Sequence, residues 1–413
     1  MANDIQTMKD APGVIASMAA KMLADKTQFC QTIDKLDPSE YSGKNGFNAG
    51  DTIYINKNAR FVSGTNADIT SAIQDVKEEK VALTLNERRV TAIALTSAEI
   101  ATEMALKSWV NRILDPAVSE MAQKIEASFL DQAMDATANL VGTPGSTVFD
   151  MDTILSAGQK IDEFACPDPD NRYMLLNPAA QRSAVNSNKG LFNNPVEVGK
   201  QYIKGRMGGN TMGFDFLSNN LLPIHTNGND VVFEVRTTVS TEGQTTLVVE
   251  ALTTTTGTVK KGTVITIASV NAVHPITKTD LGYLKQWVVA ADATADVSGY
   301  ATLTLTEPFY TSASVGLQNI TAFPVDGAAI TPAGSASTGY VQNLAYHKSA
   351  FTMVSVPLVT PSGLDMAEQK TVDGMTIRVI RDYSVLTDKL ILRLDFLGGI
   401  CAKRPEWAAR VTS

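Results

Sequence analysis

A threonine-rich stretch between residues 230 and 340 constrains this chain more than any other feature of its sequence. About a fifth of the positions in this stretch are threonine. Threonine is branched at Cβ, which favours extended strands and disfavours long helices. The sequence on either side mixes helical and strand-like patterns. We therefore expect an all-β domain that is inserted into an α/β domain.

Small and polar residues border this stretch on both sides. Asn227, Gly228 and Asn229 precede it, and residues 332–339 are mostly Gly, Ala, Ser and Thr. Both segments are typical of exposed linkers at a domain boundary. Insertion at a surface turn is tolerated, because closing a loop whose ends lie close together costs only a few kcal/mol. The sequence predicts an inserted domain over residues 229–339.

Length and composition bound the kind of protein. The chain has 413 residues, of which 44% are hydrophobic and 19% charged, as in globular proteins, and this length exceeds what one core usually holds. Two or three domains are expected. The sequence starts without a basic leader and apolar core, and no apolar run approaches the roughly 20 residues of a membrane span. We expect a soluble protein that is made in the cytosol.

The charge of the chain excludes one class of function. The formal net charge is -8. Proteins that hold nucleic acid tightly neutralise its phosphates with clustered Lys and Arg. Any nucleic acid partner of this chain is therefore expected to be enclosed and not bound through its sequence.

Two segments in the first quarter of the chain alternate between apolar and polar residues, as strands do. Residues 51–56 and 80–93 are predicted to pair as one long hairpin with a wide polar tip between residues 58 and 79. A lone two-stranded ribbon is scarcely stable, so it must lean on a neighbouring subunit or fold back on its own domain, and both remain open. Its charged residues are candidate inter-subunit contacts: Lys77, Glu78, Glu79, Lys80, Glu87, Arg88 and Arg89.

Helical periodicity is strongest over residues 116–138. Val118, Met121, Ile125, Phe129 and Ala133 form an apolar stripe on one side of the helix, and a polar stripe lies on the opposite side. Asp115 followed by Pro116 is a typical helix start. The polar stripe consists of Ser119, Gln123, Glu126 and Asp131.

Two further segments are expected to pack with other parts of the chain. A shorter helix over residues 13–25 places Val14, Met18 and Met22 on one face, and we predict that it belongs to an extended arm. Near the C-terminus, residues 390–396 alternate so that Leu390 and Phe396 share an apolar face that can cover the long helix. Arg393 and Asp395 are predicted on the opposite face.

The sequence carries no recognisable catalytic or metal-binding constellation. It lacks the nucleophile elbow, zinc-protease, Walker A and dinucleotide motifs. Cys30, Cys166 and Cys401 are far apart and are expected to be buried thiols, and His225, His274 and His347 each stand alone. The glycine cluster at 205–213 lacks a phosphate-loop ending and is expected to be a surface loop. We predict no catalytic residue, no metal site and no cofactor.

Five segments carry a resemblance to a known family. Together and in this order, they resemble the coat proteins of the Salmonella short-tailed transducing phages, which are major capsid proteins of tailed phages. The segments are Thr256–Ile267, Val273–Lys278 and Gly282–Val289 in the insertion, and Asn343–Phe351 and Ala402–Trp407 after it.

The resemblance implies an α+β architecture, the Hong Kong 97-type capsid fold with an inserted all-β barrel domain. It also implies five parts of the chain, which we state as expectations. They are an N-terminal arm (1–46), an extended loop that is a β-hairpin (47–95), a peripheral domain with a long spine helix (96–144 and 371–413), an axial domain (145–228 and 340–370) and the inserted barrel (229–339).

The resemblance further implies a structural protein that is not an enzyme. Such subunits assemble as hexamers and pentamers into the icosahedral head of a tailed phage, in the cytoplasm of the bacterial host, and enclose double-stranded DNA. Scaffolding and portal proteins are the implied partners, and no membrane is involved. In the best-known relatives a long charged loop of the insertion bridges capsomers; here the corresponding turn, residues 240–244, is short, and Glu242 is its candidate contact residue.

One alternative comes from a different functional class. The threonine-rich domain would also suit a β-rich binding or adhesin-like protein, with that domain as the recognition part. Such a protein is expected to form small discrete oligomers, whereas a capsid protein forms particles of megadalton size.

Overall fold

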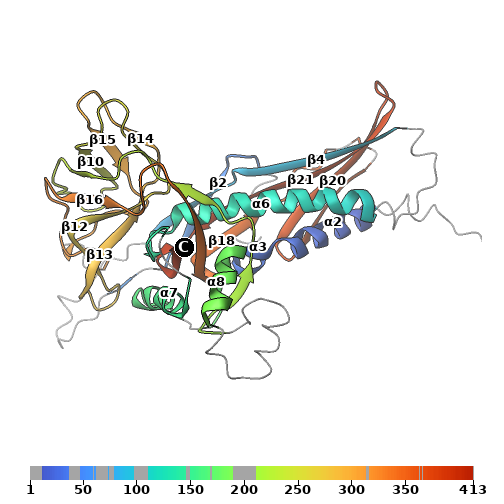
Figure 1. The fold of residues 1–413 in the computed structure, drawn as a ribbon. Helices are drawn as coiled ribbons and strands as arrows, with labels where there is room; N and C mark the ends of the chain where they lie inside the picture. Colours follow the sequence, from blue (N-terminus) through green and yellow to red (C-terminus); the bar gives the residue numbers. More distant parts are fainter. Residues whose placement is uncertain are drawn as a thin grey trace, which may run out of the picture. The chain divides into compact units, whose positions relative to one another are not determined.

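The structure, a computed structural model, describes residues 12–36, 47–58, 60–61, 73, 79–96, 110–145, 149–167, 170–188, 211–312, 316–361, 363–364 and 366–412. The chain divides into two compact units, each built from segments far apart in the sequence. The predicted α+β class is confirmed (Figure 1). Unit 1 contains Met1–Ile55, Val81–Leu130 and Phe351–Cys401, and unit 2 contains Asn56–Lys80, Asp131–Ala350 and Ala402–Ser413.

Unit 1 is organised around a six-stranded sheet. Its strand order is β1-β18-β21-β20-β19, and β4 pairs with β21 in antiparallel fashion. The alternation predicted over residues 390–396 lies within one of these strands. The bounds are β1 (Asp34–Lys35), β4 (Glu87–Thr96), β18 (Phe351–Ser355), β19 (Met366–Val372), β20 (Met375–Ser384) and β21 (Lys389–Ala402).

The long helix α6 (Asp115–Ala136) runs along these strands in Figure 1. All five residues of its predicted apolar stripe are buried, and the Phe129 ring lies 6.5 Å from that of Phe396 on β21. The predicted start of α6 is confirmed, but Asp115 does not cap a free helix end, because a short π-helical turn, η2 (Val110–Leu114), leads directly into α6. Asp115 instead makes an ion pair with Lys26 at 2.8 Å.

Two carboxylates that we expected to face solvent are buried in unit 1. Glu126 is 2% exposed and accepts hydrogen bonds from the backbone N–H groups of Gln28 and Phe29, both at 3.0 Å. These residues begin the short helix α3 (Gln28–Thr32). Asp395 is fully buried between Arg378 and Arg393. Each carboxylate departs from its pattern because a specific donor in another segment compensates the loss of water.

The N-terminal helix α2 (Pro12–Lys26) exists as predicted, but a different face is buried. Met18 is 36% exposed and Met22 is half-buried, whereas small residues face the interior. Alanine side chains permit the helix to approach β19 and β20 closely, which the larger methionines would prevent. The buried residues are Ala16, Ala19, Ala20, Leu23 and Ala24.

Unit 2 contains a second six-stranded sheet, with the order β5-β22-β17-β6-β7 and with β8 paired to β17. The helices α7 (Met151–Glu163) and α8 (Pro178–Asn188) contribute buried side chains to the same core as these strands. The strand bounds are β5 (Leu140–Val141), β6 (Arg172–Leu176), β7 (Asp215–Ser218), β8 (Ile224–Thr226), β17 (Gly339–His347) and β22 (Ala408–Thr412), with short 3-10 turns η4 (Lys348–Ala350) and η5 (Pro405–Trp407).

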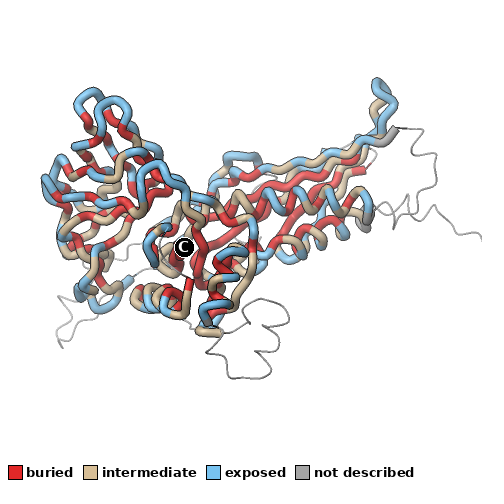
Figure 2. The backbone as a smooth tube through the Cα atoms, viewed as in Figure 1, coloured by how far each residue is buried: buried red, intermediate tan, exposed pale blue. Residues whose placement is uncertain are grey.

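The threonine-rich stretch forms an all-β part of unit 2, and many of its residues are buried (Figure 2). Its own buried core includes Trp287 and Phe309. Its main sheet has the order β13-β12-β16-β9-β10-β15, and hydrogen bonds from Ala290 to Thr304 and from Thr306 to Val288 join the ends of the first and last strands. The bounds are β9 (Phe233–Val235), β10 (Thr246–Glu250), β12 (Val264–Val273), β13 (Asp280–Val288), β15 (Ala301–Thr304) and β16 (Ala329–Pro332), beside the small pair β11 (Thr258–Val259) and β14 (Ala293–Thr294).

The first border of this stretch is not the exposed linker that we expected. Asn227 is 4% exposed, and its Nδ2 donates to the carbonyl oxygens of Ala333 and Ser335 at the other border. Gly228 is buried, and a Cβ there would lie 1.9 Å from the carbonyl oxygen of Thr258. Asn227 therefore connects the two ends of the insertion.

The predicted hairpin differs from the observed structure in one respect. Strands β2 (Thr52–Asn56) and β3 (Lys80–Thr84) pair as a two-stranded sheet, but the expected strand 80–93 is interrupted at residues 85–86. Its second half is β4, which pairs with β21. Leu83 and Leu85 are fully buried, so the base of the hairpin packs on its own unit. The gap reflects the change of partner from β2 to β21.

Candidate inter-subunit contact sites

The predicted contact residues of the hairpin fall into two groups. Lys80 and Arg88 are exposed and make no ion pair with another described residue. Glu79 is half-buried, and its carboxylate lies 3.8 Å from the Nζ of Lys57. Lys77 and Glu78 lie outside the described residues. Lys80 and Arg88, together with Tyr54 on β2, which is 67% exposed, offer the free contact groups near the base of the hairpin.

Glu87 and Arg89 are engaged within unit 1. Glu87 is 7% exposed, and it accepts hydrogen bonds from Arg89 and from the hydroxyl of Ser128 on α6. This pair attaches β4 to the long helix. The Glu87–Arg89 pair therefore makes contacts within its own subunit, which alternation along the strand does not predict.

Glu242 is likewise used within the insertion. Its carboxylate accepts hydrogen bonds from the backbone N–H of Thr311, at 3.0 Å for the shorter, and from the Thr311 hydroxyl. The short turn at 240–244 is therefore anchored to the segment that follows β15.

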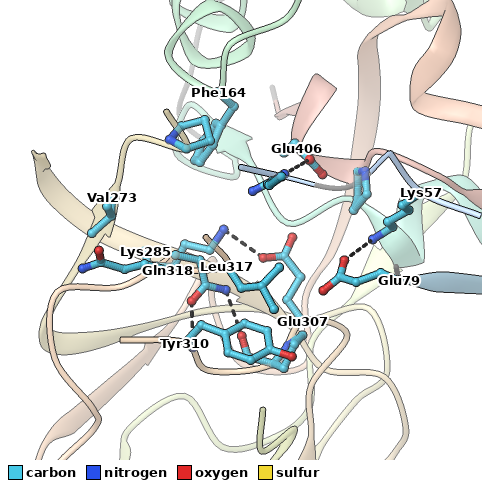
Figure 3. A pocket seen from close by; sticks show the side chains of 15 residues that line it. Lys57, Glu79, Phe164, Val273, Lys285, Glu307, Tyr310, Leu317, Gln318 and Glu406 are labelled. Atoms are coloured by element: carbon cyan, nitrogen blue, oxygen red, sulfur yellow. Dashed lines mark hydrogen bonds and ion pairs between the residues drawn. The ribbon is translucent and has the colours of Figure 1, made fainter. Parts of the chain in front are cut away.

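A small polar cavity of about 100 Å³ lies within unit 2 (Figure 3). Three ion pairs line it, so the numbers of positive and negative side chains in its lining are equal. Lys285 is almost completely buried and lies 2.9 Å from Glu307. A buried ammonium is tolerated only when such a partner compensates its desolvation. The other two pairs are Lys57 with Glu79, and Arg60 with Glu406 at 2.8 Å.

Arg410 on β22 joins three segments of unit 2. It is 1% exposed, and its guanidinium donates to the carbonyl oxygens of Thr137 and Gly262 and to the side-chain oxygen of Gln342, at 2.7 to 2.9 Å. These acceptors belong to the end of α6, to the insertion and to β17. Burial lowers the pKa of Arg410 to about 10. No motif in the sequence distinguishes this arginine from the others.

The isolated histidines and cysteines have ordinary structural surroundings. The ring of His225 contacts Asn227 and Thr263, and burial, followed by the nearby charge of Arg410, lowers its pKa. His347 packs against Trp407 at 5.9 Å. Cys30 and Cys401 are buried as predicted, and Cys166 is half-buried. Burial strongly raises the pKa of the Cys30 thiol.

Neither a metal site nor a membrane-spanning helix is found in the described part of the chain. No group of three or more His, Cys, Asp or Glu side chains is arranged to hold a metal ion there. None of the described helices has both the length and the apolar character that crossing a membrane demands.

Comparison with known proteins gives one extensive match. A family model described as P22 coat protein, gene protein 5, matches residues 14–410. A search of curated proteins finds no match. The family match favours a coat protein over the β-rich binding protein.

Several solved phage structures are weakly similar. That of Mycobacterium phage Che8 is 11% identical, with 93% of this chain and 90% of that chain covered and a TM-score of 0.47. The capsid of Ralstonia phage GP4 is 7% identical, with coverages of 92% and 87% and a TM-score of 0.47. The mature capsid of bacteriophage PhiM1 is 11% identical, with coverages of 87% and 81% and a TM-score of 0.43. At these values, the family match alone carries the assignment.

Proposed function

Because the chain belongs to the P22 coat protein family, and is therefore a major capsid protein that forms a phage head shell, we propose that its copies assemble as hexamers and pentamers through the hairpin at residues 47–95. The family match over residues 14–410 is the observation that carries this proposal. One contact that is repeated by rotation closes rings, and small variations of it allow one sequence to occupy non-equivalent positions.

The extended loop reaches the neighbouring subunit from a supported base. Leu83 and Leu85 pack in the core of unit 1, so the loop is attached to a folded unit and is not an isolated two-stranded ribbon. Lys80 and Arg88 contact acidic groups of the neighbour, which is favoured by the net charge of -8 on each copy. Lys77 and Glu78 belong to the same contact.

The remaining parts follow the division that the family implies. Residues 1–46 form an arm, residues 96–144 and 371–413 a peripheral domain, and residues 145–228 and 340–370 an axial domain. Residues 229–339 form a closed barrel, which the hydrogen bonds between Val288–Ala290 and Thr304–Thr306 support. A scaffolding protein and a portal protein direct assembly in the cytoplasm of the bacterial host.

The shell encloses double-stranded DNA without reading its sequence. The net negative charge of the subunit disfavours adhesion to the DNA phosphates, which eases both the filling of the shell with DNA and the ejection of that DNA.

Removal of the loop beyond its base tests the proposed contact. Replacing residues 58–78 with a short Gly-Ser turn retains β2, β3 and the Lys57–Glu79 pair. We expect folded, soluble subunits that form no shells, as judged by sedimentation velocity and negative-stain imaging with a scaffolding partner. A Gly-Ser replacement of the exposed turn at 385–388 is the control for loop surgery. Normal particles from the shortened chain would refute the assembly role of the loop.

A further inference from the structure

A second cavity in unit 2 has an excess of positive charge. It has a volume of about 260 Å³. The described residues that line it include three cationic side chains, Arg60, Lys278 and Arg404, and one carboxylate, Glu406. The neighbouring cavity of 100 Å³ has equal numbers of both. The imbalance is therefore local to this second cavity.

Glu406 is already occupied by two of these cations. Its Oε1 lies 2.8 Å from Nη2 of Arg60 and 3.4 Å from Nη1 of Arg404. The remaining Arg404 contacts are neutral, namely the carbonyl oxygen of Asn58 at 3.3 Å and the face of the Trp407 ring at 5.6 Å. One carboxylate thus compensates two guanidinium groups.

Lys278 has no carboxylate partner among the described residues. Its Nζ donates to the carbonyl oxygens of Gly316 and Gln318, at 3.1 and 3.3 Å, and the side chain is half-buried. Burial, with a smaller contribution from the charge of Arg60, lowers the pKa of Lys278 to about 8. A desolvated ammonium beside like charge is unfavourable unless an anion approaches it.

The rim of the cavity is apolar and exposed. Phe61 and Ile276 are 65% and 72% exposed and lie on different segments, while Phe164 and Trp407 line the cavity. Side chains that surround a charged centre and exclude water strengthen an ion pair formed there, because the local dielectric constant falls. The cavity therefore has the features of a socket for an acidic side chain.

We propose that this cavity accepts a carboxylate from a second copy of the chain when the shell assembles. The inference rests on the proposed function, because it requires copies in contact. A second copy is the partner that charge complementarity favours, since each copy carries 43 acidic and 35 basic residues. Arg60 lies four residues after the end of β2, so it belongs to the first part of the loop that we assign to assembly.

Amine labelling of the wild-type protein tests the proposal directly. At pH 7.5, an amine with a pKa of about 8 is unprotonated about 200 times more often than an ordinary lysine. Free subunits and empty shells are treated with an acylating reagent, and each lysine is quantified by peptide mass spectrometry. We expect labelling of Lys278 to fall at least tenfold in empty shells. Lys260, which is exposed and pairs with Asp292 in the same insertion, should change less than twofold.

A matched pair of charge reversals adds a second measurement. Lys278→Glu should fold with an unchanged circular dichroism spectrum but form no shells, whereas Lys260→Glu should assemble. If Lys278→Glu does not fold, the labelling experiment still decides. Equal labelling of Lys278 in subunits and shells, or normal assembly of Lys278→Glu, overturns the proposal.

Two outcomes distinguish a carboxylate socket from a phosphate site and from a chain that does not assemble. Protection of Lys278 only in DNA-filled heads would identify phosphate as the occupant and overturn the inference. A wild-type chain that forms no shells would refute the proposed function itself, whereas shells with a reactive Lys278 would refute only the socket.

Discussion

The buried carboxylate of Glu126 gives the sharpest prediction about stability. Helix α3 begins after Thr27, a residue type that usually caps a helix, but the Thr27 hydroxyl donates to the carbonyl oxygens of Leu23 and Ala24 at the end of α2. Glu126 of α6 replaces it by accepting from the N–H groups of Gln28 and Phe29. A residue 97 positions away from Phe29 therefore supplies the cap.

The substitution Glu126→Ala removes the acceptors of the Gln28 and Phe29 N–H groups; Phe29 is fully buried, whereas Gln28 is exposed. Hydrogen bonds to a charged group contribute about 1.5–3 kcal/mol each, and loss of a helix cap costs about 0.5–2 kcal/mol. Because the two bonds share one carboxylate, we expect a combined loss of about 3 kcal/mol. Glu126→Gln retains one good acceptor and should lose about half as much.

Hydrogen exchange and urea unfolding of the free subunit measure this effect. A loss of about 3 kcal/mol should accelerate exchange of the amides of residues 28–32 by about 100-fold, if they open locally. Glu120→Ala is the control, since the side chain of this residue of the same helix is 54% exposed and its one ion pair among the described residues is with Lys124. Its effect should stay below about 0.5 kcal/mol. Equal exchange rates in Glu126→Ala and Glu120→Ala would refute the capping role.

Two further predictions concern other parts of the chain. Gly399→Ala places a Cβ 2.3 Å from the carbonyl oxygen of Thr84, so it should displace β3 from β21 and lower the melting temperature in calorimetry. The control is Gly158→Ala, whose Cβ would lie 3.5 Å from its nearest neighbour and should not lower the melting temperature. Equal melting temperatures of the two variants would contradict the close contact. The folded-state pKa of His225 lies below 6.5, so the unfolded chain binds the proton more tightly and the free energy of unfolding should fall as the pH drops below about 6.5. In urea titrations, His225→Gln should lose less of this free energy than the wild type between about pH 7 and pH 5. An unchanged loss would exclude this histidine as the cause.

The candidate inter-subunit contact residues show how much can be predicted from sequence patterns. Charge and alternation identified the hairpin region, and the structure leaves Lys80 and Arg88 exposed there. The same reasoning placed Glu87 in the contact set, but Ser128 of α6 binds it inside unit 1. The socket around Lys278 was missed, because its lining comes from distant segments and no local spacing relates them.

The sequence by itself determined several elements whose pattern depends on residues a few positions apart, although it did not give the buried face of α2. The apolar stripe of α6 and the strand character of the threonine-rich stretch follow from local periodicity and residue type, whereas the coat protein family was indicated by five short segments and their order. Such patterns persist because burial of one face is the largest favourable term in folding.

Only the tertiary structure decided which polar groups are compensated. Glu126, Asp395 and Arg410 are buried because donors or acceptors far away in the sequence meet them. A polar side chain has the same local pattern whether water or a distant partner satisfies it, so its burial depends on the fold and not on its neighbours in the chain.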